Sequence, residues 1–195
     1  MSGVGFRGDW RRLSENHWLP QQAAGLARSF AAKHLQPEPD LLPTHDQLAM
    51  DVDSCALRWV QSDPGTLVET CLAEIDLLIG RSRNDDVSNV ASWSDLFLVF
   101  DQSDVGLGVV EMLADRGIEV HHTFDANKRA GRSKKLHFYK GDARVKATTI
   151  HSFKGWEARE IVVVVASKGL AARKRLYAGL TRLKRSDRGS YLTIV

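Results

Sequence analysis

The chain of 195 residues lacks the features of disulfide-rich, zinc-bound and membrane proteins. It has only two cysteines, Cys55 and Cys71, and both stand among apolar residues. Two thiols without neighbouring ligands favour neither a disulfide framework nor a zinc site, so we expect them to be reduced. No apolar run is long enough to span a bilayer, and the first dozen residues have no signal-peptide core. We therefore expect a cytoplasmic protein without a membrane partner.

The sequence also lacks a Walker A loop. That loop reads Gly, four residues, Gly-Lys-Ser/Thr, and it wraps phosphates in backbone N–H groups. The nearest stretch, GRSKK from Gly131, does not have this spacing. The segment DLFLVFDQ imitates the strand that presents a Mg²⁺-binding carboxylate, but without a phosphate loop we interpret Asp101 as an ordinary acidic strand end. We expect no metal site, and we do not expect the chain alone to hydrolyse ATP.

Length and charge are those of an ordinary globular domain. The 27 basic and 24 acidic residues give a net charge of +3. Such an excess permits contact with nucleic acid but does not argue for it, because basic faces are commonly just solvated. A basic cluster between Lys128 and Lys140 fits phosphate contact and a solvated surface loop about equally well.

Strand-like and helix-like segments alternate, which predicts an α/β fold. Upstream, we expect a helix from Pro20 to about Leu35, a strand at 55–61 and a helix after Thr66. Further along, the expected strands are 95–100, 118–124, 144–150, 160–166 and 189–195, the expected helices are 103–117 and 170–185, and 127–142 is expected to be a polar connection. This alternation implies a parallel sheet with helices on its faces, and such sheets bind ligands at the carboxyl ends of their strands.

Two segments carry most of the functional information. The first is TIHSFKGWE, Thr149 to Glu157, and the second is RLYAGLTRLKR, Arg175 to Arg185. They resemble motifs V and VI of superfamily 1 helicases of the UvrD/Rep type. In that family the patterns run roughly Thr-hydrophobic-His-x-x-Lys-Gly-x-Glu and Arg-hydrophobic-Tyr-hydrophobic-small-hydrophobic-Thr-Arg. Both patterns are matched in the right order, and a hydrophobic strand follows each.

The resemblance implies the second RecA-like domain, the C-terminal motor domain, of an ATP-dependent DNA helicase. It implies a parallel sheet with helices on both faces and no Walker A loop of its own. We divide the chain into 1–94, a helical and irregular part, and 95–195, the RecA-like core, within one domain overall. The first part carries a degenerate helicase segment, WRRLSENHWLP, in which Leu13 and Asn16 fit the family but His17 and Trp18 replace its usual tyrosine and arginine.

The resemblance also implies roles for individual residues. Arg182 would be the arginine finger, placed on the last turns of a helix with Tyr177 beside it in the nucleotide site. Glu157 would accept hydrogen bonds from the ribose, and Gly155 would allow close backbone approach. The implied contacts to single-stranded or duplex DNA come from Thr149, His151, Ser152 and Lys154. ATP with Mg²⁺ would be held mainly by a first RecA-like domain, supplied in cis or in trans.

A second interpretation stays open at this point. The chain could be a non-catalytic module that binds nucleic acid or a partner on a degenerate helicase domain. Trp18 favours this alternative, because a neutral indole cannot replace the charge of an arginine. Taken alone, Thr149–Glu157 could be a polar turn capped by Ser152, and Arg182 could be a solvated arginine near a helix C-terminus. The sequence does not distinguish DNA from RNA.

Overall fold

The fold is described by a computed structural model that covers residues 19–35, 55–84, 92–125, 127–139 and 141–195. The segment with Leu13, Asn16, His17 and Trp18 lies outside these residues, and so does Lys140 of the basic cluster.

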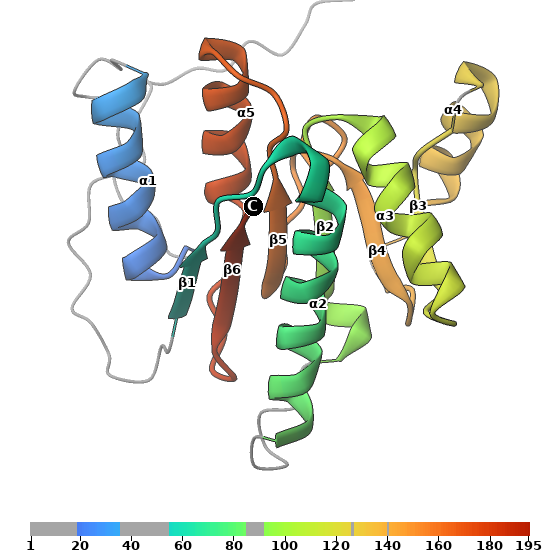
Figure 1. The fold of residues 1–195 in the computed structure, drawn as a ribbon. Helices are drawn as coiled ribbons and strands as arrows, with labels where there is room; N and C mark the ends of the chain where they lie inside the picture. Colours follow the sequence, from blue (N-terminus) through green and yellow to red (C-terminus); the bar gives the residue numbers. More distant parts are fainter. Residues whose placement is uncertain (1–18, 36–54, 85–91, 126, 140) are drawn as a thin grey trace, which may run out of the picture.

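One parallel sheet of six strands forms the framework of the described residues. The strand order is β1-β6-β5-β2-β4-β3, and each neighbouring pair is parallel (Figure 1). The strands are β1 Cys55–Trp59, β2 Leu96–Phe100, β3 Val120–His122, β4 Val145–Thr149, β5 Glu160–Val164 and β6 Ser190–Ile194. Every residue of β2 and β5 is buried, as expected for strands that are covered on both faces.

Helices cover both faces of this sheet. They are α1 Gln21–His34, α2 Leu67–Asn84, α3 Ser103–Asp115, α4 Lys128–His137 and α5 Leu170–Leu180, with short 3₁₀ turns at Pro64–Thr66 and Trp93–Asp95. Helices α1 and α5 pack on one face, and α2 and α3 pack on the other (Figure 1). Helix α5 lies so close to the sheet that a Cβ on Gly179 would stand 3.0 Å from Val163 of β5. The expected α/β class, with a parallel sheet between two helical layers, is confirmed.

The residues upstream of 95 contribute to the same sheet. Strand β1 pairs with β6 along its whole length, from Cys55 opposite Ser190 to Trp59 opposite Ile194. Helix α2 buries Cys71 and Ile75 in the core beneath β2 and β5. Burial raises the pKa of the Cys71 thiol to about 12, so this side chain serves as a small apolar core group.

Two sequence-based expectations about helices were wrong. The polar connection expected at 127–142 contains helix α4, near the β3 end of the sheet (Figure 1). Its only large apolar side chain, Leu136, is 80% exposed, so no apolar stripe marked the helix. The last helix, expected to reach Arg185, ends at Leu180. Arg182 therefore lies in the loop before β6 and not on a helical turn.

Candidate nucleotide and nucleic-acid site

The segment from Thr149 to Glu157 crosses one face of the sheet, from the edge formed by the carboxyl ends of the strands to the edge formed by their amino ends. It leaves the carboxyl end of β4 and reaches the amino end of β5, and β2 lies between these two strands. Phe153 is buried, and its ring centroid lies 5.2 Å from that of Phe97 on β2. Trp156 meets the same ring edge-on at 6.3 Å. These aromatic contacts hold the segment against the sheet where a crossover helix would otherwise lie.

The beginning of the segment forms a polar turn at the carboxyl edge. The Ser152 N–H donates to Thr149 Oγ1 at 3.2 Å, and the Thr149 hydroxyl lies 3.1 Å from the Ser152 hydroxyl. The Ile150 N–H donates to the Phe100 carbonyl at 2.8 Å, which ties the turn to the end of β2. His151 and Lys154 are exposed beside this turn. A capped turn is therefore present, but Thr149 and not Ser152 accepts the main-chain N–H, and the turn leaves the His151 and Lys154 side chains facing solvent.

The end of the segment lies at the opposite, amino edge of the sheet. Gly155 adopts a φ of +89°, a value that side-chain-bearing residues avoid, and it turns the chain toward β5. Glu157 follows, with its Oε2 atom buried and without a hydrogen-bond partner among the described residues. A buried carboxylate oxygen normally has a donor, so an unmatched one marks a position where a ligand donor would be accommodated.

Glu157 lines a polar cavity of about 610 Å³ at this amino edge. Opposite walls come from the loop between α5 and β6, which contributes Lys184, Arg185 and Arg188, and from Asp95 before β2. This loop thus brings basic side chains to the cavity that Glu157 lines; Lys184 and Arg185 end the second helicase-like segment, and Arg188 lies beyond it. The dense run KRSDR at 184–188 is the signal that could have indicated it, because charged residues gather there just before a strand.

Arg182 lies on the segment adjacent to Glu157. The Ala158 N–H donates to the Arg182 carbonyl at 3.1 Å, and Ala158 forms a parallel bridge with Leu183. The Arg182 side chain is half-buried, but it is not among the residues that line the Glu157 cavity. Tyr177 is also half-buried, packs against the core of the α1 and α5 face, and has its pKa raised by burial.

The candidate site residues are therefore divided between two edges of one sheet. Thr149, His151 and Ser152 lie at the carboxyl edge, as the rule for parallel sheets predicts. Glu157 precedes the amino end of β5, and Arg182 precedes β6, so that rule does not hold for these two residues. The difference arises because the connection from β4 to β5 is short and carries its polar residues across the whole face.

Asp101 has a structural position. One of its carboxylate oxygens accepts the Ala166 N–H at 3.0 Å, and the other accepts the Ser167 N–H at 3.1 Å and the Ser167 hydroxyl. Arg175 of α5 donates to the Ser167 hydroxyl at 2.7 Å and lies 3.7 Å from Asp101. The Asp101 side chain is 1% exposed. It fixes the connection from β5 to α5, which agrees with its interpretation as an acidic strand end.

A buried ionic cluster next to the Glu157 cavity was not found from the sequence. The Arg159 guanidinium lies 2.7 Å from the Glu160 carboxylate and 3.6 Å from the Asp95 carboxylate. The side chains of Arg159 and Glu160 are almost fully buried. Burial raises the pKa of Glu160 to about 7, against the opposing effect of Arg159. The pair stands at the start of β5, where the pattern EIVVVVA predicts only a buried strand.

The described residues show neither a metal-binding cluster nor a membrane-spanning helix. They contain no group of three or more His, Cys, Asp or Glu side chains arranged to hold a metal ion. Among the same residues, no helix combines the length and apolar character needed to cross a bilayer.

Comparison with known proteins gives a match at the level of structure. No family model and no curated protein matches the chain. A solved structure of the C-terminal domain of a possible DNA helicase from Lactobacillus plantarum WCFS1 matches with a TM-score of 0.51 at 13% sequence identity. The match covers 92% of this chain and 88% of that one. At this identity the likeness shows the fold alone, and it is consistent with the expected RecA-like arrangement of a parallel sheet between helices.

Proposed function

We propose that this chain is the C-terminal motor domain of an ATP-dependent DNA helicase of the UvrD type. The observation that supports this most strongly is the course of the segment 149–157. Its first residues present polar and basic groups at the carboxyl edge of the sheet. Its last residue, Glu157, stands beside Arg182 at the amino edge, where main-chain hydrogen bonds join the two segments. One short segment thus has a surface for a strand at one end and a surface for a nucleotide at the other.

At the nucleotide end, each side chain has a distinct task. The unmatched Glu157 oxygen accepts hydrogen bonds from the ribose hydroxyls. Arg182 directs a permanently charged guanidinium toward the transferring phosphoryl group, where charge spreads over the phosphate oxygens. ATP and Mg²⁺ are held mainly by the Walker A loop of a first RecA-like domain. This chain completes that site and does not hydrolyse ATP on its own.

At the nucleic-acid end, the contacts are made to the backbone of a DNA strand. The exposed His151 and Lys154 provide donors and charge, and the hydroxyls of Thr149 and Ser152 provide further donors to phosphate oxygens. Contacts of this kind bind without sequence preference and weaken with salt. The aromatic packing of Phe153 on Phe97 makes the segment a firm connection between its two ends. Binding of a strand at one edge can therefore shift the equilibrium of nucleotide binding at the other.

A reconstitution experiment tests this function. The full chain is mixed with a separately purified first RecA-like domain of a UvrD-type helicase, and ATP hydrolysis is measured with and without single-stranded DNA. We expect no turnover from the chain alone and DNA-stimulated turnover from the mixture. A first domain with its Walker A lysine changed to alanine serves as the control. ATP turnover by the purified chain alone would overturn the proposal. Turnover by the first domain that does not change when the chain is added would overturn it as well.

A second candidate function is a non-catalytic module that binds nucleic acid or a partner. One observation favours it, namely that the Arg182 side chain does not line the cavity that Glu157 lines. In this case the chain binds single-stranded DNA, and its addition leaves hydrolysis by the first domain unchanged. The same reconstitution therefore separates the two functions.

A further inference from the structure

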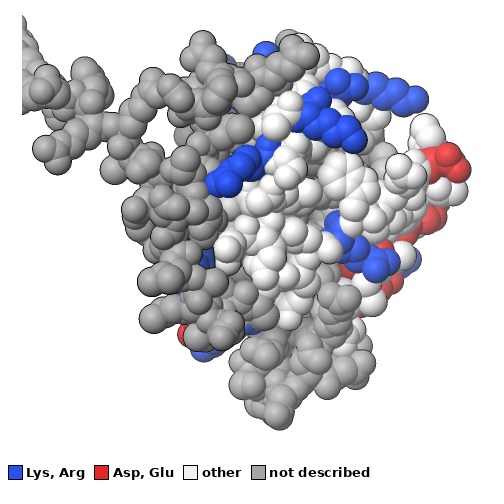
Figure 2. All heavy atoms as spheres, turned by 90° about the vertical axis from the view of Figure 1, so that its left-hand side faces the viewer, with Lys and Arg blue, Asp and Glu red and all other residues white. Residues whose placement is uncertain are grey.

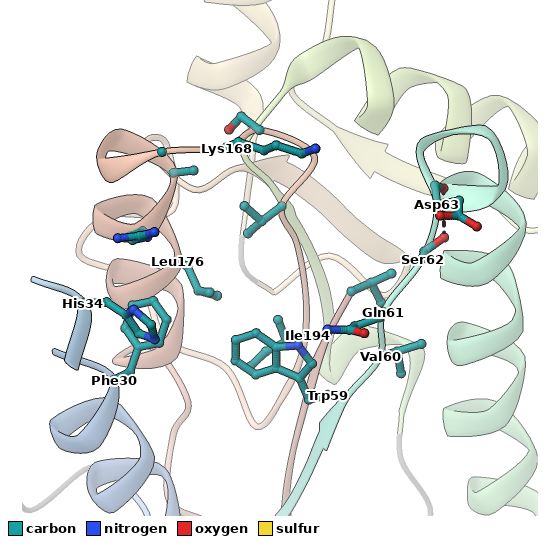
Figure 3. A pocket seen from close by; sticks show the side chains of 16 residues that line it. Phe30, His34, Trp59, Val60, Gln61, Ser62, Asp63, Lys168, Leu176 and Ile194 are labelled. Carbon is teal, nitrogen blue, oxygen red and sulfur yellow. Dashed lines mark hydrogen bonds between the residues drawn. The ribbon is translucent and has the colours of Figure 1, made fainter. Parts of the chain in front are cut away.

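A second, larger cavity lies at the carboxyl edge of the sheet, away from the Glu157 cavity. It has a volume of about 840 Å³ and opens between the end of α1, the start of α5 and the ends of β1 and β6. Figure 3 shows Phe30 and His34 of α1 on one side, Trp59 of β1 on the other, and Lys168 above the space between them. The proposed nucleotide and strand contacts use none of these side chains.

The lining of this cavity is mixed, and its apolar part comes from the core and from β1. Phe30, Leu176 and Ile194 are buried residues of the core, and each contributes to the lining. Trp59 forms a wall of the cavity and is 51% exposed, an unusual degree for the largest apolar side chain. Two residues earlier on β1, and so on the same side of the strand, Leu57 is also exposed. Exposed apolar side chains on an edge strand, next to a cavity with an apolar part, are characteristic of a docking surface.

The rim of the cavity is basic on the side of α5. Lys168 and Arg173 line it, both are exposed, and neither has an ion-pair partner in the described part of the chain. Asp63, across the cavity, is the one acidic side chain among the described residues of the lining. Figure 2, viewed from the side of α1, shows lysine and arginine side chains gathered in the upper part of the molecule next to a broad uncharged surface.

We propose that this cavity binds an acidic peptide segment of a partner protein. A large apolar side chain of that segment enters the cavity and packs on Trp59, Phe30 and Leu176. Carboxylates that flank the apolar residue pair with Lys168 and Arg173, which have no ion-pair partner among the described residues. The proposal is independent of the helicase function, because it uses the opposite end of α5 from Arg182 and a different cavity.

The lining favours a peptide over a nucleic-acid strand. Part of the lining comes from aliphatic side chains, among them Ala172, Leu176 and Ile194, which suit a leucine or phenylalanine side chain. Trp59 is the one indole among the described residues of the lining, and the carboxylate of Asp63 lines the same space. The phosphates of a nucleic-acid strand would be repelled by the Asp63 carboxylate. A peptide with one apolar anchor can place its flanking carboxylates on the α5 side, away from Asp63.

Peptide binding to the full chain tests this inference. The probes are fluorescein-labelled peptides of about 12 residues, each with Trp, Phe or Leu as its central residue. In one set glutamates flank this residue, and in the other set lysines flank it. Fluorescence anisotropy at low salt gives the affinities. We expect the acidic set to bind at least about tenfold more tightly than the basic set. Trp59→Ala should abolish this binding, and Trp93→Ala, which changes an exposed tryptophan at the other edge, should not.

A charge reversal makes the test sharper. The double variant Lys168→Glu with Arg173→Glu should invert the preference, so that the basic set binds more tightly than the acidic set. Lys174→Glu changes an exposed lysine of the same helix that does not line the cavity, and it should leave the preference unchanged. Equal affinities of the two sets would overturn the proposal. If no peptide binds but an oligothymidylate binds to the wild type and not to Trp59→Ala, the occupant is nucleic acid and the proposal is wrong. If no peptide binds but the chain forms a dimer that Trp59→Ala abolishes, the occupant is a second copy of the chain and the proposal is again wrong.

Discussion

The main chain of Arg182 lies directly beside that of Ala158, because the Ala158 N–H donates to the Arg182 carbonyl at 3.1 Å. The Lys184 N–H donates to the Ala158 carbonyl at 2.7 Å, which completes the pairing. These bonds use only backbone atoms. Substitution of the Arg182 side chain therefore leaves the connection between the two segments intact and tests the guanidinium itself.

We expect Arg182→Ala to reduce ATP turnover by the reconstituted pair of domains by on the order of a thousandfold or more, as loss of an arginine finger does elsewhere. Affinity for a non-hydrolysable ATP analogue and the thermal unfolding midpoint should change little. Arg182→Lys should recover little activity, because an ammonium group does not offer the planar set of donors. Lys174→Ala, an exposed change on α5, is the control. Full turnover by the Arg182→Ala variant would remove this residue from the reaction.

Glu157→Ala should separate ligand binding from stability. The Oε2 atom is buried and has no hydrogen-bond partner among the described residues, so its removal costs no bond within them and should leave urea unfolding unchanged or shifted to higher urea. A hydrogen bond to a charged group contributes about 1.5–3 kcal/mol, so affinity of the reconstituted domains for the ATP analogue should fall roughly 10- to 150-fold. Glu69→Gln, an exposed change on α2, is the control. Unchanged affinity would show that the ribose is held elsewhere.

The sequence was sufficient for those elements whose apolar pattern is unambiguous. The buried runs of β2 and β5 predicted central strands, and Gly117 after α3 has the φ of +74° expected of a helix stop. Helix α4 could not be found in this way, because it sits at the margin of the sheet and buries almost no apolar side chain. Intrinsic propensity alone is a weak signal for such a short, basic segment.

The sequence pointed to a set of candidate residues but not to their arrangement. The spacing from Thr149 to Glu157 identified the segment, and a strand before it placed Thr149 at the carboxyl edge. Its crossing to the amino edge depends on Phe153 and Trp156 packing on Phe97, which are long-range contacts. The cavity beside Glu157 depends in turn on the loop after Arg182, because that loop folds back against Ala158.

Asp101→Ala should destabilise the fold. The substitution leaves the Ala166 N–H, the Ser167 N–H and the Ser167 hydroxyl without their acceptor, and it removes the carboxylate that lies 3.7 Å from the Arg175 guanidinium. Removal of one partner from a buried charged network typically costs about 3–5 kcal/mol, and Asp101→Asn, which keeps one acceptor oxygen, should cost less. Urea unfolding of both variants measures the effect. If Asp101→Ala instead keeps full stability and loses Mg²⁺-dependent nucleotide binding, Asp101 is a metal ligand and not a structural anchor.

Lys154→Ala should weaken binding to single-stranded DNA uniformly across sequences. Lys154 is exposed beside the polar turn at the carboxyl edge, so its removal deletes a charge without disturbing the Thr149–Ser152 hydrogen bonds. Loss of one phosphate contact should lower the slope of log affinity against log salt by about 0.7. Anisotropy titrations over a range of salt concentrations give this slope. An unchanged slope would place Lys154 outside the strand-binding surface, and Lys174→Ala is again the control.

The remaining prediction concerns the buried carboxyl group of Glu160. Burial raises its pKa from an ordinary value of 4.5 to about 7, and Asp95 adds to this effect while Arg159 opposes it. Between these two pH values the folded protein holds a proton that the unfolded chain has released. The unfolded state then binds fewer protons, so the free energy of unfolding decreases as the pH rises through this interval.

We therefore expect the wild-type protein to lose on the order of 3 kcal/mol of stability from this group between about pH 4.5 and 7, since one pKa unit corresponds to about 1.4 kcal/mol. The contribution should be constant above pH 7, where the carboxyl is ionised in both states. Glu160→Gln cannot ionise, so the difference in unfolding free energy between the variant and the wild type should grow in the variant's favour from pH 5 to pH 7. Urea unfolding of both proteins at several pH values measures this difference. A difference that is constant with pH would show that Arg159 keeps Glu160 ionised throughout, and that the ion pair outweighs the cost of burial.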